Sequence, residues 1–248
     1  MLHKVFIGYD SREAVASHVA AHSIIRHTCS GVMTNYLKHR ELRRDGFFRR
    51  PWLIRPHDGE FIDLVDGKPF STEFSHTRFL VPALSFYHGW SLFMDADMIF
   101  TDDIKKLFDL RDDKYAVMCV PHTHNVVEDS IKMDHRLQQN YRRKNWSSFV
   151  LWNCAHPANR AVTEDYVNTA SGAEMHSFSW LSDDQIGFLP FTYNYIHGVS
   201  PDIGGARPSV LHLTNGGPWF DDYSEKNPYA SLWEYEYEDW KRKGEPRD

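Results

Sequence analysis

Cysteine is scarce in this sequence, and its spacing excludes two common structural devices. The 248 residues include three cysteines, Cys29, Cys119 and Cys154, and no C-x-x-C pair. An odd number without metal-ligand spacing argues against a disulfide framework and against a structural zinc site. Cys119 and Cys154 lie within apolar runs, as small buried hydrophobic residues do. We therefore expect the protein to occupy a reducing compartment.

Long apolar runs, internal repeats and low-complexity tracts are also absent. No apolar run approaches the roughly 20 residues that cross a bilayer, and residues 4–8 read as a short strand rather than a signal peptide. No stretch rich in proline, glycine and serine separates two domains. We expect a cytoplasmic protein without a membrane span, folded as one domain over residues 1–248.

An excess of positive charge is absent as well. The formal net charge is −6, so the overall electrostatics give no reason to expect nucleic acid or an anionic membrane as a partner. Basic residues cluster in two segments, 39–50 and 142–144. A solvated surface is the simpler interpretation of both, and nucleic acid as an acceptor stays open as the alternative.

Strand and helix patterns alternate along the chain. Short apolar runs predict strands at 5–8, 52–55, 91–94, 115–120, 148–152 and 210–213. Helical spacing covers 12–27, 70–87 (interrupted by Pro82), 104–108, 159–169 and 229–241. This alternation predicts an α/β fold with a mostly parallel central sheet and helices on both faces. Residues 225–248 form an aromatic helical extension in this prediction, and packing on the core is its simplest role.

The segment Trp90–Phe100 contains the most informative pattern. Asp95 and Asp97, separated by Ala96, lie between two apolar runs, so a buried strand delivers both carboxylates to one small volume. Two carboxylates are costly there unless a hard cation offsets their charge. Mg²⁺ or Mn²⁺ holding a diphosphate would do so, which points to a nucleotide-sugar transferase. An acidic turn is the alternative for an isolated D-x-D.

A late strand ends in His212 and is followed by a turn with Gly216 and Gly217. A neutral imidazole suits Mn²⁺ as a third protein ligand, and backbone amides of the turn could hold phosphate oxygens. A lone histidine at a strand end is usually an ordinary polar residue, but the D-x-D upstream favours the ligand interpretation. Asp95, Asp97 and His212 are thus the predicted metal ligands.

The end of the first predicted strand carries a second candidate site. Gly8 would let a ligand approach the backbone, Tyr9 offers a face on which a base can stack, and Asp10 could accept from an imide N–H. Asp10 would lie at the carboxyl end of its strand, where such sheets bind ligands. A strand-to-helix turn capped by Asp10 or Ser11 explains the same residues.

Two further groups of polar residues have both a functional and a structural interpretation. Arg78 lies among apolar residues and needs an anionic partner, which could be a donor phosphate or one of the acids. His122, His124 and Trp146 could contact an acceptor, and ordinary loops explain them equally well.

The D-D-Q segment at Asp184 and Gln185 also has two interpretations. A carboxylate can hold sugar hydroxyls, and a glutamine carbonyl can steady positive charge that develops at an anomeric carbon. The alternative is a helix start capped by Ser182.

Taken in order, these motifs resemble the GT-A-fold glycosyltransferases of the glycogenin and bacterial galactosyltransferase type, family eight. The order is an acid after the first strand, an arginine-bearing helix, the apolar D-x-D strand, the D-Q segment and a late H-x-T…G-x-P-W turn. The resemblance implies a Rossmann-like nucleotide-sugar-binding domain, a UDP-sugar as donor, Mn²⁺ or Mg²⁺, and retention of anomeric configuration. We expect a saccharide as acceptor, with nucleic acid as the alternative.

The resemblance also implies a role for each matching residue. Asp10 matches the base-contacting acid, Arg78 the donor-side arginine, and His212 the third metal ligand. The residues implied in donor binding are Gly8, Tyr9, Asp10, Arg78, Asp95, Ala96, Asp97, Gly216 and Gly217. The residues implied in catalysis, against the donor sugar and its anomeric centre, are Asp184 and Gln185.

Some positions depart from the family pattern. Gly217 stands where the family has a lysine that holds the diphosphate, and Ile186 replaces the second acid of D-Q-D. Lys226 or Arg207 would have to replace that lysine. Two other functions stay open: a D-x-D phosphatase, for which Ile99 stands where a hydroxyl residue is needed, and a nucleotide-sugar-binding module without turnover.

Overall fold

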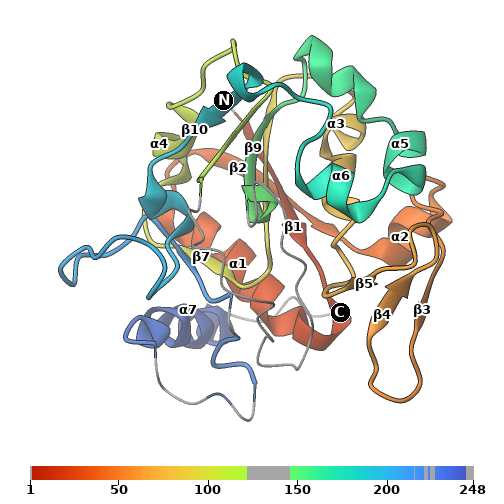
Figure 1. The fold of residues 1–248 in the computed structure, drawn as a ribbon. Coiled ribbons are helices and arrows are strands. Elements are labelled where there is room, and N and C mark those ends of the chain that lie inside the picture. Colours follow the sequence, from red (N-terminus) through yellow and green to blue (C-terminus); the bar gives the residue numbers. More distant parts are fainter. Residues whose placement is uncertain (1, 122–145, 215, 221–222, 224–226, 244–248) are drawn as a thin grey trace.

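A six-stranded sheet runs through the centre of the protein, in the strand order β10-β8-β9-β6-β1-β2 (Figure 1). The computed structural model describes residues 2–121, 146–214, 216–220, 223 and 227–243. The strands of this sheet are β1 (Leu2–Gly8), β2 (Gly31–Leu37), β6 (Trp90–Met94), β8 (Val117–Cys119), β9 (Phe149–Asn153) and β10 (Ile186–Phe188).

All strands of the sheet except β9 run in the same direction. β1 pairs in parallel with β2 and β6, β10 pairs in parallel with β8, and β9 is antiparallel to β6 and β8. Ile7 is the partner of Met94, and Met94 is the partner of Phe149, so β1 and β6 end level with the start of β9. We refer to this side as the carboxyl edge. The predicted mostly parallel α/β sheet is confirmed.

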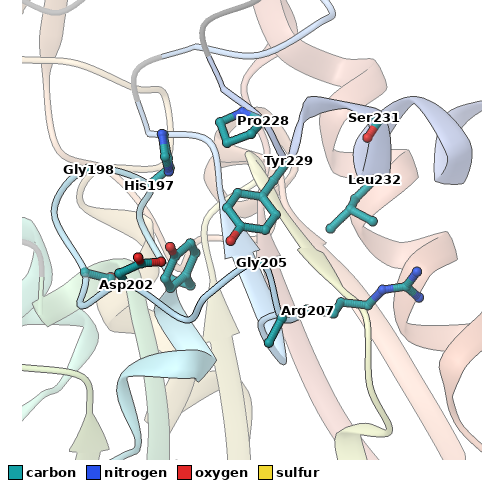
Figure 2. Close-up of a pocket in the computed structure, with 12 residues that line it drawn as sticks. His197, Gly198, Asp202, Gly205, Arg207, Pro228, Tyr229, Ser231 and Leu232 are labelled. Carbon is teal, nitrogen blue, oxygen red and sulfur yellow. The ribbon is translucent and has the colours of Figure 1, made fainter.

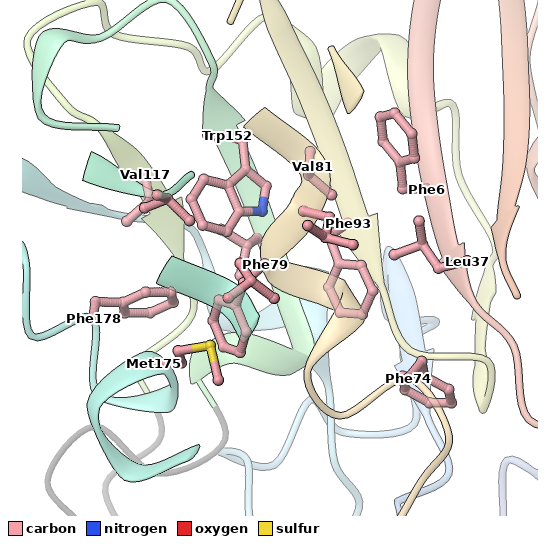
Figure 3. Packing of buried hydrophobic residues seen from close by; sticks show 14 of the residues in the cluster. Phe6, Leu37, Phe74, Phe79, Val81, Phe93, Val117, Trp152, Met175 and Phe178 are labelled. Atoms are coloured by element: carbon pink, nitrogen blue, oxygen red, sulfur yellow. The ribbon is translucent and has the colours of Figure 1, made fainter. Parts of the chain in front are cut away.

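Side chains of the central strands alternate between two buried layers. Phe6 and Phe93 belong to one layer, which α3, α5 and α6 cover (Figure 3), and Ile7 and Leu92 belong to the other, which α1 and α4 cover. The helices are α1 (Ala14–His27), α2 (His39–Arg44), α3 (Val81–Leu84), α4 (Ile104–Phe108), α5 (Glu164–Thr169), α6 (Gly172–His176) and α7 (Ala230–Lys243). Because strand side chains alternate with period two, a sheet buried on both faces needs apolar residues at successive positions.

The remaining strands form two smaller antiparallel sheets. One joins β7 (Met98–Phe100) to β11 (Val210–His212), and the other contains β3 (Trp52–Ile54), β4 (Phe61–Asp63) and β5 (Pro69–Phe70). The 3-10 segments are η1 (Ser11–Glu13), η2 (Thr77–Leu80), η3 (Trp146–Ser148), η4 (Pro157–Ala161), η5 (Asp183–Gln185) and η6 (Phe191–Asn194). The strands predicted near residues 52 and 210 therefore exist, but outside the central sheet.

The C-terminal helix α7 packs along α1 (Figure 1). Trp233 is buried, and Asp239 accepts a hydrogen bond of 2.9 Å from His22 Nε2. Hydrogen bonds from Lys243, Arg242 and His22 lower the pKa of Asp239, so this carboxylate stays charged. Of the extension predicted at 225–248, the structure describes 227–243. Among the described residues, no helix is both long enough and apolar enough to cross a membrane.

The helix predicted over 70–87 is mostly wrong. Phe70 belongs to β5, the helical segments there are η2 and α3, and Pro82 occupies the first turn of α3. Phe86 and Tyr87 have φ angles of 52° and 54°, which end the helix. The apolar residues in this segment are buried on more than one side, so their spacing reflects burial rather than one helical face.

Candidate metal and donor site

Asp95, Asp97 and His212 come together at the carboxyl edge. One potential ligand atom of each residue lies within 4.8 Å of those of the other two, and His212 Nε2 is 3.3 Å from Asp97 Oδ1. Two carboxylates and one imidazole form a donor set that suits Mn²⁺ or Mg²⁺. The side chains are thus close enough to hold one cation.

The strand pairing explains why residues so far apart in sequence meet here. The chain turns after β6 and enters β7, where Met98 is the partner of His212. The Asp97 carbonyl accepts a hydrogen bond of 2.9 Å from Leu213 N, which ties the D-x-D turn to the end of β11. Ala96 is only 2% exposed. Its side chain therefore belongs to the core, and its predicted donor contact would have to come from its backbone.

A buried asparagine orients the His212 ring. Asn194 is fully buried, its Nδ2 donates to Ser148 Oγ at 3.0 Å, and its Oδ1 lies 2.8 Å from His212 Nδ1. Because the amide oxygen can only accept, this network assigns the hydrogen to His212 Nδ1. In the neutral ring, Nε2 then keeps its lone pair on the side of Asp97, as a metal-binding histidine requires. Nothing in the sequence pattern pointed to Asn194.

We expect Asn194→Ala to lower the affinity for Mn²⁺ by roughly 10- to 100-fold, the usual effect of losing such a supporting partner. The reason is that His212 could then rotate or take the other tautomer. Calorimetric titration with Mn²⁺ measures the effect. Asn159→Ala is the matched control, because Asn159 is also fully buried and its side chain bonds to the carbonyls of Ala116 and Asn153 and to Trp180, away from His212. Equal Mn²⁺ affinity in both variants would contradict the orienting role.

Arg78 lies beside the same cluster. It is 6% exposed, and its Nη1 lies 2.9 Å from Asp95 Oδ1 and donates to the Ser147 carbonyl at 3.0 Å. The predicted ion pair with one of the acids is therefore present. The buried Nε of Arg78 has no acceptor among the described residues. A donor group of the arginine thus remains for an anionic or hydroxylated ligand.

Ser147 and His176 extend this wall of the site. Ser147 is 3% exposed, and its hydroxyl lies 2.7 Å from His176 Nδ1. Burial and the nearby charge of Arg78 lower the pKa of His176 well below its ordinary value. The ring is therefore neutral, and Arg78 carries the positive charge of this wall. The sequence analysis did not single out either residue.

Hydrogen bonds within the protein occupy both carboxylate oxygens of Asp10. It is buried, accepts from Arg12 N at 3.0 Å and from Arg12 Nε at 2.8 Å, and also accepts from Glu73 N at 3.1 Å. Burial tends to raise the pKa of Asp10, but the hydrogen bonds and charge of Arg12 outweigh it and leave that pKa lowered. Asp10 caps η1, as the structural interpretation predicted. Contact with a base would need a rearrangement of Arg12.

The two residues before Asp10 differ in what they can offer a ligand. A side-chain atom on Gly8 would lie 2.5 Å from the Phe74 ring, so Phe74 fills the space that we predicted for a ligand. This contradicts the role predicted for Gly8. Tyr9 is half-buried, and the rings of His18 and Tyr36 contact it edge-on. Tyr9 therefore stays a candidate for stacking with a base.

The glycine-rich turn after β11 is only partly available. Gly216 N donates to the Leu213 carbonyl at 2.9 Å, so its amide does not hold a phosphate in this arrangement. Gly217 is buried against the Trp219 ring, which leaves no room for a larger residue. Trp219 Nε1 in turn donates to Glu13 at 3.1 Å. Of the two glycines predicted to contact phosphate, Gly217 therefore remains.

The D-Q segment lies at the opposite side of the sheet, where the parallel strands begin. The Gln185 carbonyl accepts from Ala116 N, and the Ala116 carbonyl accepts from Asn153 N, at the end of β9. Asp95 N instead donates to the Ser148 carbonyl, just before the start of β9. The five residues of β9 span about 16 Å at 3.3 Å per residue. The length of β9 therefore separates Gln185 from Asp95, Asp97 and His212.

This placement contradicts the prediction that Asp184 and Gln185 flank the anomeric centre. Asp184 is exposed, and Gln185 Oε1 accepts from Ser182 N at 3.2 Å in a capping arrangement. The capping interpretation is the one that the structure supports. The physical reason is that β10 begins directly at Ile186, which puts the D-Q segment before a parallel strand instead of after one.

Of the other basic and histidine candidates, the structure describes Arg207, which does not join the cluster. Arg207 precedes β11, whereas His212 is at the end of that strand, so Arg207 cannot replace the missing diphosphate lysine. His122, His124, the basic segment 142–144 and Lys226 lie outside the described residues.

Comparison with known proteins gives one close relative in sequence. Protein CDI of Arabidopsis thaliana is 41% identical over 242 residues, which cover 96% of this chain and 87% of the relative. The chain belongs to the family of Protein CDI. No model of a known protein family matches it.

Solved structures share the fold at much lower sequence identity. The glycosyltransferase GlyE of Streptococcus pneumoniae TIGR4 is similar over 98% of this chain, with a TM-score of 0.63 and 15% identity, and the chain spans 62% of GlyE. The galactosyltransferase LgtC is similar over 95% of both chains, with a TM-score of 0.56 and 13% identity. The protein therefore has the GT-A fold of these glycosyltransferases, which confirms the predicted resemblance in fold.

Proposed function

We propose that the protein is a glycosyltransferase that takes its sugar from a nucleoside-diphosphate sugar, most simply a UDP-sugar. The meeting of Asp95, Asp97 and His212 at the carboxyl edge of a GT-A fold carries this proposal. These residues would hold Mn²⁺ or Mg²⁺. When bound, the cation would offset the charge of the donor diphosphate and of the departing nucleotide.

Other residues of the site would bind and orient the donor. Arg78 would use its unengaged Nε donor to hold a phosphate or the donor sugar, while its Nη1 keeps Asp95 in position. Tyr9 would stack on the base. Ser147, buried beside Arg78, would face the donor sugar and help to exclude water. Asp184 and Gln185 have no part in this proposal.

The acceptor and the stereochemistry follow from analogy. LgtC has been solved with donor and acceptor sugar analogues, and we propose a saccharide acceptor here as well. Retention of anomeric configuration is proposed because the resemblance to family eight implies it. We further propose a single catalytic domain in the cytoplasm, where the three cysteine thiols would stay reduced.

Calorimetric titration with UDP, GDP and ADP tests the donor site, first with Mn²⁺ and then with EDTA. We expect binding that is selective for UDP and that weakens by at least tenfold in EDTA, because the diphosphate would then face two carboxylates with Arg78 as the neighbouring positive charge. A screen of UDP-sugars for transfer and for donor hydrolysis would follow.

The other outcomes separate the alternatives. Failure of all three nucleotides to bind would contradict the proposal. The similarity to glycosyltransferases would then concern the fold alone. Binding of UDP without transfer or hydrolysis would favour a nucleotide-sugar-binding module. Release of phosphate from simple monoesters would favour the D-x-D phosphatase.

A further inference from the structure

A second cavity, of about 630 Å³, lies between the segment that follows Tyr195 and the start of α7 (Figure 2). Its lining includes none of the three residues of the metal cluster. Its volume lies within the range of pockets that hold small molecules. The proposed donor chemistry leaves this cavity without a role.

Two tyrosines form the inner wall of the cavity. Tyr195 is 2% exposed, and its ring meets that of Tyr229 edge-on, with centroids 5.4 Å apart. Burial and a hydrogen bond with Tyr229 raise the pKa of Tyr195 to about 12, so the Tyr195 hydroxyl is uncharged. The half-buried Tyr229 ring also contacts the His197 ring. The wall thus offers apolar ring surface and neutral hydroxyl groups side by side.

Opposite charges stand on the two sides of this wall. Figure 2 shows Asp202 on one side of the Tyr229 ring and Arg207 on the other, and both are exposed. Asp202 Oδ1 accepts from Gly204 N at 2.9 Å, which fixes the carboxylate within its turn. The pair supplies acceptors and donors without net charge. This balance favours an uncharged ligand that is rich in hydroxyl groups.

A smaller cavity of about 190 Å³ adjoins the 630 Å³ cavity along α7. The two share Arg207 and Leu232, and the second adds Tyr235 and Glu236. Tyr235 is 58% exposed. Tyr229 and Tyr235 are about 9 Å apart along the helix axis, at 1.5 Å per residue. We refer to the two cavities together as the α7 groove, which is longer than one sugar ring.

The charges of the α7 groove argue against a polyanion. Arg26, which lies over the Tyr235 ring, forms an ion pair with Glu236, and Asp202 balances Arg207. A nucleic acid or a sulfated glycan would need cations without such partners.

We propose that the α7 groove binds a neutral oligosaccharide. The aromatic rings would pack on the apolar faces of the sugars, and Asp202, Arg207 and the tyrosine hydroxyls would bond to their hydroxyl groups. This binding goes beyond sugar transfer and does not depend on it. The groove is linked to the transfer site, because His212 N donates to the Tyr195 carbonyl at 2.9 Å. The use of the groove to anchor the acceptor glycan rests on the proposed function.

Binding is tested with the full-length protein by saturation-transfer-difference NMR and calorimetry. The probes are maltohexaose, cellohexaose, laminarihexaose and xylohexaose, with a heparin hexasaccharide as the anionic comparison. We expect at least one neutral probe to bind, and we expect Tyr229→Ala and Asp202→Asn each to weaken it by about tenfold. Asp112→Asn is the matched control: Asp112 Oδ1 accepts from Lys114 N at 3.1 Å in a similar turn, outside the groove.

The Asp97→Asn variant keeps this test separate from the proposed function. It should bind the oligosaccharide as the unmodified protein does, even though its nucleotide binding is lost. Absence of binding to all four neutral probes would overturn the groove proposal. Binding that Tyr229→Ala and Asp202→Asn leave unchanged, or a preference for the heparin probe, would overturn it too. Binding of the oligosaccharide without binding of any nucleotide would support the groove proposal and contradict the proposed transferase function.

Discussion

Replacing Asp97 by asparagine is expected to abolish sugar transfer while the protein stays folded. Asparagine has nearly the same shape, but it removes one of the two negative charges that would face the cation, and its amide nitrogen cannot act as a ligand. Asp97 and His212 are only 3.3 Å apart, so the loss falls at the centre of the site. We expect transfer to decrease by roughly 10³-fold, the upper range for removal of one preorganised electrostatic contact.

The measurement is the rate of transfer from the UDP-sugar that the screen identifies, together with Mn²⁺ affinity and thermal unfolding. Asp109→Asn is the control, because Asp109 is exposed and forms a surface ion pair with Lys105. It should leave transfer unchanged. Full activity of Asp97→Asn, or full activity of the unmodified protein in excess EDTA, would refute the metal-dependent mechanism.

The meeting of Asp95, Asp97 and His212 could be predicted because its signals are local. Apolar residues on both sides of Asp95 and Asp97 predict a buried strand and a turn, and parallel strands end at one edge of a sheet. The fold class followed from the same alternation of strands and helices. β2 was missed because it is a partly exposed edge strand whose residues Thr34 and Asn35 break the apolar pattern.

Contacts between distant segments could not be predicted from such signals. Asn194 orients His212 from a 3-10 segment, and nothing in its neighbourhood marks it as different from other asparagines. Phe74 fills the space beside Gly8 because of tertiary packing. Asp184 and Gln185 matched a motif in order, but motif order does not reveal at which end of its strand a segment lies. That depends on β10, a three-residue strand that the sequence analysis did not predict.

The basic segment 39–50 is another part of the chain whose contacts could not be predicted from the sequence. It was interpreted as a solvated surface, yet Arg50 is fully buried, and its Nε donates to Asp63 at 2.9 Å. Its Nη1 also donates to the carbonyls of Val167 and Ala170, at 3.1 and 2.6 Å. Arg50 therefore ties the segment after α2 to β4 and to the end of α5. A buried arginine with all these partners is part of the core and offers no charge to a nucleic acid.

Arg50→Met is expected to lower the free energy of unfolding by about 3–5 kcal/mol, because it leaves Asp63 buried without its counter-charge. This is a large share of the roughly 5–15 kcal/mol that stabilises a typical domain. Urea denaturation measures the effect. Arg49→Met is the matched control, since Arg49 is the adjacent residue and pairs with Asp165 in an exposed ion pair, which is worth about 1 kcal/mol or less.

A double variant separates two free-energy terms: the cost of leaving Asp63 buried without a counter-charge, and the stabilisation that the ion pair itself provides. Arg50→Met combined with Asp63→Leu removes both charges, and buried ion pairs can often be replaced by apolar residues at little cost. We expect the double variant to be more stable than Arg50→Met alone. Recovery should be partial, because Asp63 also accepts from the amides of Val65 and Asp66. Equal losses in Arg50→Met and Arg49→Met would mean that Arg50 is solvated after all, and the basic segment would again be a candidate surface for nucleic acid.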